Sequence, residues 1–264
     1  MLTELDLQGS AAAPCELELE VGSEVALARV LGAMDGVHPV QPIAAEWCAP
    51  LEWSPAWSAA WQKHGGQAVH AWHSLVFHRE LRLPLRCRLS AEVVAQRPTR
   101  AGAITVVRYL AIADDGPVWT THAGVLWRGV AAPAHGDLRE PDLAEPGPVV
   151  ATTRVAVPAD FAHRYSMASG IWNPVHTDPE AARSAGLEAP ILHGSATLGL
   201  ALTAAQEQAG ARCLEELSVR FVAPVLLPDL LTVAISGTGG VLFADVRGED
   251  DARVLRLRAR YTTS

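Results

Sequence analysis

The chain has 264 residues, of which 49% are hydrophobic and 19% are charged, so a packed globular protein is expected rather than a disordered one. The formal net charge of −8 argues against a general electrostatic affinity for nucleic acid or for an anionic membrane. The four cysteines form no CxxC pair, which predicts neither a zinc site nor a redox motif. No leader-like start and no apolar run long enough to cross a bilayer is visible, so a soluble, cytoplasmic protein with free thiols is expected.

A segment rich in proline and acidic residues, 131–149, has no helical or strand period and predicts a linker. It would separate an N-terminal part, residues 1–130, from a C-terminal part, residues 150–264. The two parts are similar in size, and each has a pattern of helices followed by strands.

In the N-terminal part, residues 24–31 predict a helix with Ser23 as its N-cap. Trp53, Trp57 and Trp61 recur every four residues and would share one helix face. That stripe predicts core packing, or else the wall of a site for a bulky apolar ligand. Strands are predicted over 69–77, 87–94, 104–113 and 118–130.

In the C-terminal part, a short apolar stretch at 150–157 precedes a predicted helix over 160–170. Asp178 and Pro179 then predict the start of a short helix that Gly186 ends. Residues 194–208 predict a helix that is apolar nearly all round and therefore buried. Four strands are predicted after it, over 217–221, 230–235, 241–246 and 255–261.

Residues 165–199 hold the motif that carries chemistry, with Ser169-Gly170, Asn173-Pro174-Val175-His176, and then Pro190 and His193-Gly194 in order. A second motif follows, with Arg220-Phe221, Pro224-Val225 and Pro228-Asp229. Together they resemble the MaoC-like, or (R)-specific enoyl-CoA hydratase, family of hot-dog proteins. The resemblance implies an α+β double hot-dog fold, with two repeats of a central helix wrapped by an antiparallel sheet and a ligand tunnel between them.

The resemblance also implies a hydratase or dehydratase that acts on an acyl thioester of coenzyme A or of an acyl carrier protein, as a monomer or homodimer, without metal or cofactor. In such a site an aspartate and a histidine hold the water, and a backbone N–H of the central helix binds the thioester oxygen. His176 would be the acid/base, Asn173 would support its loop, and Gly194 or Ser195 would supply the N–H. Ile171, Trp172, Ser195 and Arg220 are expected to contact substrate.

The sequence departs from the family at Ile171, which takes the place of the aspartate and cannot exchange a proton. Three interpretations follow: a hydratase whose second polar group lies elsewhere, a different acyl-thioester reaction that uses His176 alone, or a non-catalytic binder or partner subunit. Replacement groups near by are Asp178, which is expected instead to cap a helix, and Tyr165, Ser166 and His163.

Other polar residues have simpler expectations. His193 is expected to hydrogen-bond backbone rather than to react, and His70, His73 and His78 to be surface or partly buried strand residues. Arg220 would either grip coenzyme A phosphates or pair with Asp229. Arg256, Arg258 and Arg260 are expected to form a solvated strand face.

Overall fold

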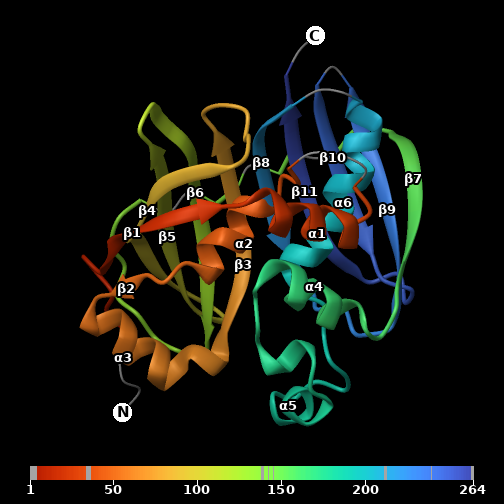
Figure 1. Ribbon diagram of the computed structural model, residues 1–264. Coiled ribbons are helices and arrows are strands. Elements are labelled where there is room, and N and C mark those ends of the chain that lie inside the picture. Colours follow the sequence, from red (N-terminus) through yellow and green to blue (C-terminus); the bar gives the residue numbers. More distant parts are fainter. Residues whose placement is uncertain are drawn as a thin grey trace.

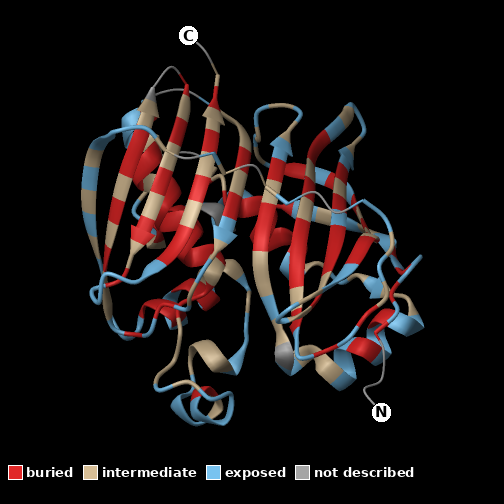
Figure 2. Ribbon diagram, turned by 180° about the vertical axis from the view of Figure 1, so that it is seen from behind, coloured by how far each residue is buried: buried red, intermediate tan, exposed pale blue. Residues whose placement is uncertain are grey.

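In the computed structural model, the described residues are 5–33, 37–137, 140–141, 143–144, 146–210, 213–238 and 240–262. Their strands form one antiparallel sheet of eleven strands that curls around the helices (Figure 1). Seen from behind, the strands alternate between buried and less buried residues, as expected when one face of a sheet covers a core (Figure 2).

The C-terminal repeat has the elements that the sequence predicts. Its strands are β7 (Val149–Val157), β8 (Leu214–Phe221), β9 (Asp229–Thr238), β10 (Val241–Arg247) and β11 (Arg253–Tyr261). Its helices are α4 (Phe161–Ser169), the 3₁₀ turn η2 (Pro174–His176), α5 (Pro179–Ser184) and α6 (Gly194–Ala209). Helix α4 ends at Gly170, whose φ of 77° is the left-handed conformation typical of a glycine that stops a helix. Asp178 caps α5 by accepting the N–H of Glu180 at 2.8 Å, as predicted.

The N-terminal repeat has the four predicted strands and several elements that were not predicted. Its strands are β1 (Ala11–Leu19), β2 (Glu52–Trp53), β3 (Ala68–Phe77), β4 (Leu85–Thr99), β5 (Gly102–Ala113) and β6 (Gly116–Arg128). Its helices are α1 (Val21–Val30), α2 (Gln41–Cys48), α3 (Pro55–His64) and the short turn η1 (Gly65–Gln67). The N-cap of α1 is Glu20, so the prediction of Ser23 was wrong: the helix begins before the serine.

The strand order is β2-β1-β4-β5-β6-β3-β8-β11-β10-β9-β7. Read outward from the centre, the two repeats mirror each other, with β3, β6, β5, β4 and β1 matching β8, β11, β10, β9 and β7. The strands β3 and β8 pair antiparallel from Trp72 opposite Arg220 to Val76 opposite Glu216. This central pair, here called the seam, confirms a double hot dog built on a continuous sheet.

Helix α6 is the central helix of the C-terminal repeat, and most of its residues are buried. Gly199 lets the end of α1 come close, because a Cβ there would lie 2.6 Å from Cδ1 of Leu31. Helix α1 therefore packs on the C-terminal repeat, while the eight-residue α2 is the buried helix of the N-terminal repeat. The central helix of the N-terminal repeat, α2, is therefore half as long as α6, the central helix of the C-terminal repeat.

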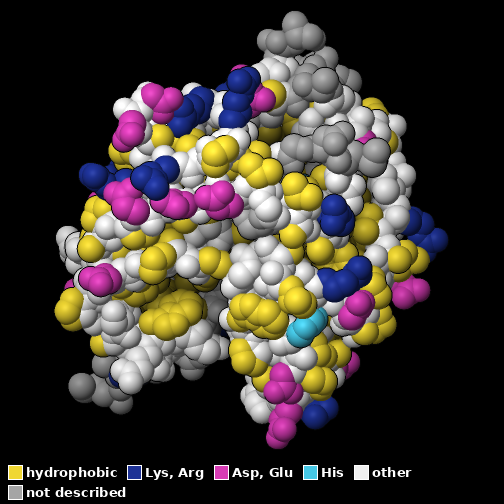
Figure 3. Space-filling model, in the orientation of Figure 1, with side chains coloured by type: hydrophobic (Ala, Val, Ile, Leu, Met, Phe, Trp, Pro, Cys, Tyr) yellow, Lys and Arg dark blue, Asp and Glu magenta, His cyan; other side chains and the backbone are white. Residues whose placement is uncertain are grey.

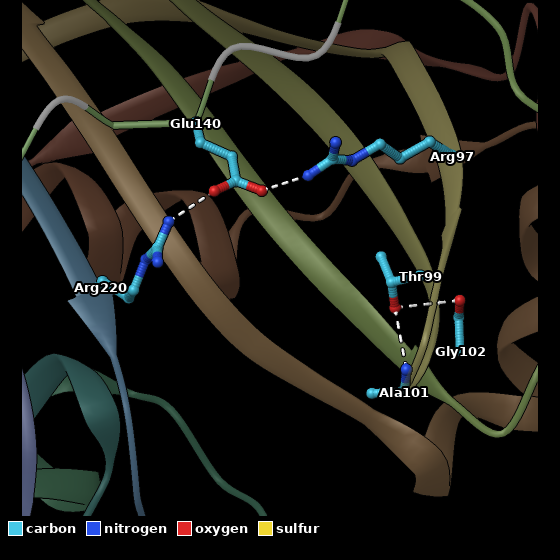
Figure 4. A network of polar contacts seen from close by, with 6 residues as sticks. All are labelled: Arg97, Thr99, Ala101, Gly102, Glu140 and Arg220. Atoms are coloured by element: carbon cyan, nitrogen blue, oxygen red, sulfur yellow. Dashed lines mark hydrogen bonds and ion pairs between the residues drawn. The ribbon is translucent and has the colours of Figure 1, made fainter.

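The chain between β6 and β7 lies on the outer face of the sheet. His135 pairs with Gln96 of β4 through two backbone hydrogen bonds of 2.8 and 2.9 Å. Further along, the carboxylate of Glu140 binds Arg97 of β4 and Arg220 of β8 (Figure 4). One carboxylate therefore links a strand of each repeat across the seam, on the side away from the central helices.

Candidate active site at the N-terminus of helix α6

The loop after α4 holds His176. Asn173 begins the turn η2, and its Oδ1 accepts the N–H of Val175 at 3.2 Å. Pro174 follows at the first position of the turn, where a missing N–H costs nothing. The side chain of Asn173 is thus used to form the turn that presents His176, the supporting position expected for it.

The His176 imidazole lies against the rest of the loop with one nitrogen fixed. Its Nδ1 lies 2.9 Å from the carbonyl oxygen of Ile191, which can only accept, so Nδ1 carries the proton of the neutral ring. This leaves Nε2 as the basic nitrogen. Burial lowers the pKa of His176 below its usual value, which keeps the ring neutral and able to accept a proton.

The ring of His193 packs face to face against the ring of His176. The two rings stack with centroids 3.7 Å apart and an interplanar angle of 27°. Nε2 of His193 lies 3.3 Å from the carbonyl oxygen of Ile171 and 3.2 Å from Oγ of Ser166, so it hydrogen-bonds backbone as predicted. Burial and the neighbouring His176 lower the pKa of His193 to about 3, so this ring is neutral too. The buried ring of Tyr165 lies 5.0 Å away and completes the packing around it.

The N-terminus of α6 faces the same place, because His193 is its N-cap and Gly194 its first residue. The first intrahelical bond runs from Thr197 N–H to the His193 carbonyl, so the amides of Gly194, Ser195 and Ala196 precede the helical ladder. Such amides, together with the helix dipole, favour a negatively charged oxygen. Phe221 of β8 covers Gly194 closely, with ring atoms 3.1–3.2 Å from where a Cβ would stand.

The other predicted loop residues lie around this pair of imidazoles. Ile171 is partly buried, and its side chain packs against the hydrophobic core. Trp172 is 57% exposed and meets the exposed His163 edge to face, at 5.5 Å between ring centroids. Of the groups suggested to replace the aspartate, Tyr165 and Ser166 are buried beside His193, and His163 lies at the surface.

Arg220 is not part of this group. Along β8, Leu217, Val219 and Phe221 face the core, so Arg220 between them faces outward, where it pairs with Glu140 (Figure 4). The substrate contact expected for Arg220 does not agree with this placement. Its expected pairing with Asp229 was also wrong, since that carboxylate accepts the backbone N–H groups of Leu230 and Glu249.

The tryptophan stripe lies elsewhere. Trp57 stacks between Trp53 and Trp61, and two of the three rings meet Trp127 edge to face. Trp57 is buried, as core packing predicts, whereas Trp61 is 42% exposed. Trp53 lies in β2, before the helix begins at Pro55, so the prediction that all three share one helix face was wrong. The space-filling view shows a notch in the lower part of the molecule, between the side that carries α3 and the side that carries α5 (Figure 3). In the ribbon view, α3, which carries Trp57 and Trp61, lies across from the segment between α4 and α5, which contains His176 (Figure 1).

The sequence did not reveal a second polar cluster, which lies under α2. Glu46, His73 and His70 follow one another on the inner face of the N-terminal repeat. The sequence predicts His73 to be a surface or partly buried strand residue, but its side chain is fully buried. In the part of the chain that the structure describes, no three His, Cys, Asp or Glu side chains are grouped to hold a metal ion. Nor does any helix in that part have the length and apolarity needed to span a membrane.

Comparison with known proteins agrees with the geometry. Residues 143–254 match the family model of the MaoC like domain. The matched residues make up most of the C-terminal repeat and include His176 and the N-terminus of α6. The structure superposes along its whole length on a MaoC-like dehydratase from Phytophthora capsici, with a TM-score of 0.85, 19% identity and coverage of 98% of that chain. It also superposes on Rv0216 from Mycobacterium tuberculosis, described as a double hotdog fold, with a TM-score of 0.64, 16% identity and 96% coverage of each chain.

Sequence relatives point the same way. Enoyl-CoA hydratase ChsH3 of M. tuberculosis is 30% identical over 190 residues, which are 63% of this chain and 65% of that protein. The peroxisomal enoyl-CoA hydratase 2 of Arabidopsis thaliana is 58% identical over 36 residues, 14% of this chain and 12% of the relative. The peroxisomal hydratase-dehydrogenase-epimerase of Saccharomyces cerevisiae is 42% identical over 74 residues, 28% of this chain. The chain spans 8% of this last relative and 12% of the Arabidopsis enzyme.

Proposed function

We propose that the protein is a lyase that adds water to, or removes it from, the carbon–carbon double bond of a 2-enoyl thioester. The observation that carries this proposal is the position of His176, whose ring stacks on the N-cap residue of α6 with Nδ1 fixed by a carbonyl. The neutral imidazole of His176 thus lies next to the first backbone amides of α6, which no helical hydrogen bond uses. The names of the relatives, enoyl-CoA hydratase and MaoC-like dehydratase, support the same chemistry.

The proposed step balances with this one base. A water molecule forms a bond from its oxygen to Cβ of the enoyl group, and its proton passes to Nε2 of His176. The electron pair of the double bond moves toward the thioester carbonyl, whose oxygen becomes an enolate bound by the N–H of Gly194 or Ser195. Cα then takes the proton from the His176 imidazolium, which restores the neutral ring. Dehydration is the same sequence reversed.

Ile171 is expected to limit the rate of this reaction, because its side chain cannot act as a second acid or base. A second acid or base typically contributes a factor of about 100 to 10,000, and a side chain of carbon and hydrogen contributes none of it. The proposed enzyme is therefore slower than a family member with the aspartate, or its substrate reacts more easily.

The proposal also covers the group that carries the acyl chain, the cellular location and the number of sites. Both coenzyme A and acyl carrier protein present the same pantetheine arm, and the site accepts the thioester from either. The four cysteines are unpaired, which fits a reducing, cytoplasmic location. One site is proposed for each chain, in a monomer or a homodimer, because only the C-terminal repeat carries Asn173 and His176.

The direct test is hydration of a panel of trans-2-enoyl pantetheine esters, followed by the loss of the conjugated absorbance. Turnover by the parent protein is expected, with a fall of at least about 100-fold in kcat for His176→Ala. His78→Ala is the matched control, since His78 is an exposed histidine whose side chain hydrogen-bonds Oγ1 of Thr120, away from the proposed site. Equal rates for the parent and His176→Ala would refute the assignment of the base.

The second candidate function is binding without catalysis, and Ile171 is the observation that favours it. In that case the saturated and unsaturated esters raise the melting temperature equally, and none of the unsaturated esters loses its absorbance. Turnover of any ester that depends on His176 would exclude this function.

A further inference from the structure

Helix α4 directs two hydroxyl groups into the interior beside the proposed site. Tyr165 and Ser166 are both fully buried, and the ring of Tyr165 lies 5.0 Å from the ring of His193, the N-cap residue of α6. Oγ of Ser166 lies 3.2 Å from Nε2 of His193. The hydroxyl of Tyr165, in contrast, forms no hydrogen bond of standard geometry with any residue that the structure describes. A buried hydroxyl without a partner is unfavourable, so this one needs a reason.

The side chain of Ser195 is the polar group that approaches this hydroxyl. Burial raises the pKa of Tyr165, and Ser195 acts in the opposite direction, as a donor to the tyrosyl oxygen does. A serine proton directed at that oxygen does not use the proton of the tyrosine itself. The O–H of Tyr165 is therefore left without an acceptor among the described residues.

The position of Ser195 locates this free donor. Ser195 is the second residue of α6, so the hydroxyl of Tyr165 lies at the N-terminus of that helix. The amides of Gly194, Ser195 and Ala196 precede the helical ladder there, and they are the donors assigned to the thioester oxygen. A carbonyl oxygen has two lone pairs and can accept from an amide and a hydroxyl together.

We propose that Tyr165 is a further catalytic residue, whose hydroxyl donates a hydrogen bond to the thioester carbonyl oxygen beside the amide of Gly194 or Ser195. The inference rests on the proposed binding of an acyl thioester at the N-terminus of α6. The bond strengthens as the oxygen takes up the negative charge of the enolate, because a charged acceptor binds a donor more tightly than a neutral one. The phenol keeps its proton throughout, so no proton transfer is added to the reaction.

This role gives the site a second reactive side chain, although Ile171 supplies none. An aspartate would act on the water, whereas Tyr165 acts on the other reactant. Its hydrogen bond draws electrons from the conjugated double bond toward the oxygen, and Cβ becomes easier for water to attack. His176 then remains the one group that exchanges protons.

The first test observes the carbonyl group itself and needs no turnover. The probe is the octanoyl pantetheine ester, isotope-labelled at the thioester carbonyl, whose infrared stretching frequency falls when its oxygen accepts a hydrogen bond. The ester bound to Tyr165→Phe is expected to absorb at a higher frequency than the ester bound to the parent. The phenylalanine keeps the ring against His193 and removes one oxygen atom, so the packing is retained.

Tyr261→Phe is the matched control. Tyr261 is also buried, its hydroxyl has no partner in the described part of the chain, and it is the last residue of β11. In the ribbon view β11 ends near the C-terminus at the top, whereas α4 lies in the lower half of the molecule (Figure 1). The control is expected to keep the parent frequency.

Ser195→Ala is a second variant at the site. It keeps the backbone amide and removes the hydroxyl that orients Tyr165, so a frequency between those of the parent and Tyr165→Phe is expected. Should Tyr165→Phe fail to fold, an unchanged frequency in Ser195→Ala would count against the inference.

Hydration of a trans-2-enoyl pantetheine ester separates a catalytic role from a structural one. Tyr165→Phe is expected to lower kcat by about 100-fold and to change KM by less than about 3-fold, because a donor to an oxyanion acts mainly in the transition state. Its melting temperature should not fall, since the lost hydroxyl had no partner. Tyr261→Phe is expected to keep the parent kcat and KM.

Three results would overturn the inference: equal carbonyl frequencies in the parent and Tyr165→Phe, an equal change in Tyr261→Phe, or an unchanged kcat in Tyr165→Phe. A protein that binds no ester loses both this inference and the proposed function. A carbonyl frequency that depends on Tyr165, in a protein that hydrates no unsaturated ester, refutes the hydratase proposal and retains the hydrogen bond from Tyr165 to the thioester.

Discussion

The backbone carbonyl of Ile171 accepts a hydrogen bond from Nε2 of His193 at 3.3 Å. Ile171, at the position where the family resemblance leads us to expect an aspartate, thus holds its backbone against the imidazole that stacks on His176. The side chain of Ile171 packs on the core. The hydrogen bond uses the backbone carbonyl, so it does not depend on which side chain residue 171 carries.

The first prediction restores the acid. Under the proposed function, Ile171→Asp is expected to raise the hydration rate by about 100-fold, since a carboxylate in the loop of His176 would supply the second group that holds the water. The nearby negative charge also raises the pKa of His176, so the acid limb of the kcat/KM profile moves to higher pH. Ile171→Asn, similar in size but uncharged, is the control, and an equal gain in both variants would show that the charge is not responsible.

The second prediction concerns the fit at the helix N-terminus. In Gly194→Ala, the new Cβ would lie 3.1–3.2 Å from the Phe221 ring, closer than ordinary contact, so the ring must shift. We expect a loss of about 1–3 kcal/mol in the free energy of unfolding, together with a fall in kcat/KM. Denaturant unfolding and steady-state kinetics measure the two effects. The double variant with Phe221→Leu should recover stability, and failure to recover would mean that the ring is not the obstacle.

The third prediction uses the protonation of Glu46. Its pKa is raised to about 8 in the folded protein, so between pH 4.5 and 8 the unfolded chain has released a proton that the folded chain keeps. The stabilisation from this group is complete at low pH and is lost as the pH rises through that window. Glu46→Gln keeps the shape without the titration, so its stability relative to the parent should increase by up to about 1.4 kcal/mol per pH unit.

Unfolding in denaturant at several pH values between 5 and 8 checks this slope. Glu92→Gln is the matched control, because Glu92 lies at the surface in a pair with Arg108. Parallel curves for Glu46→Gln and the parent would mean that Glu46 is ionised in the folded protein.

The fourth prediction concerns Arg220, which faces away from the proposed site. Arg220→Ala is expected to leave the KM for pantetheine esters unchanged and to cost no more than about 1 kcal/mol of stability, as for other exposed ion pairs. Arg97→Ala removes the other partner of Glu140 and should behave alike. A rise in KM in Arg220→Ala but not in Arg97→Ala would show that Arg220 contacts the substrate.

The sequence predicted the C-terminal repeat well because its signals are local. Helix caps at Asp178 and Gly170, an apolar helix and alternating strands each lie within a few residues of one another. The strand β1 was missed because Pro14 interrupts its short alternation, and its register shifts beside that proline. Helix α2 has only eight residues and no side-chain cap, so Pro42 in its first turn is a weak signal for its start.

Within the candidate site, the motif located His176, Asn173 and Gly194 in one loop and one helix start. It could not predict that His70 of β3 packs against Phe221 of β8, because a bulge in β3 and the seam decide which side chains meet there. Likewise the outward direction of Arg220 depends on strand parity and on a carboxylate 80 residues away. Contacts between residues so far apart in the sequence cannot be predicted from the spacing of residues within one motif.

The seam between β3 and β8 also bears on how such a protein diverges. When two identical subunits assemble side by side, every substitution occurs in both, and neither half can specialise. Because here both halves belong to one polypeptide, an ancestral duplication would free one copy to keep the imidazole loop and the other to shorten its helix and acquire a carboxylate and two histidines. The shared hydrogen bonds of Trp72–Val76 with Glu216–Arg220 hold the two specialised halves in register.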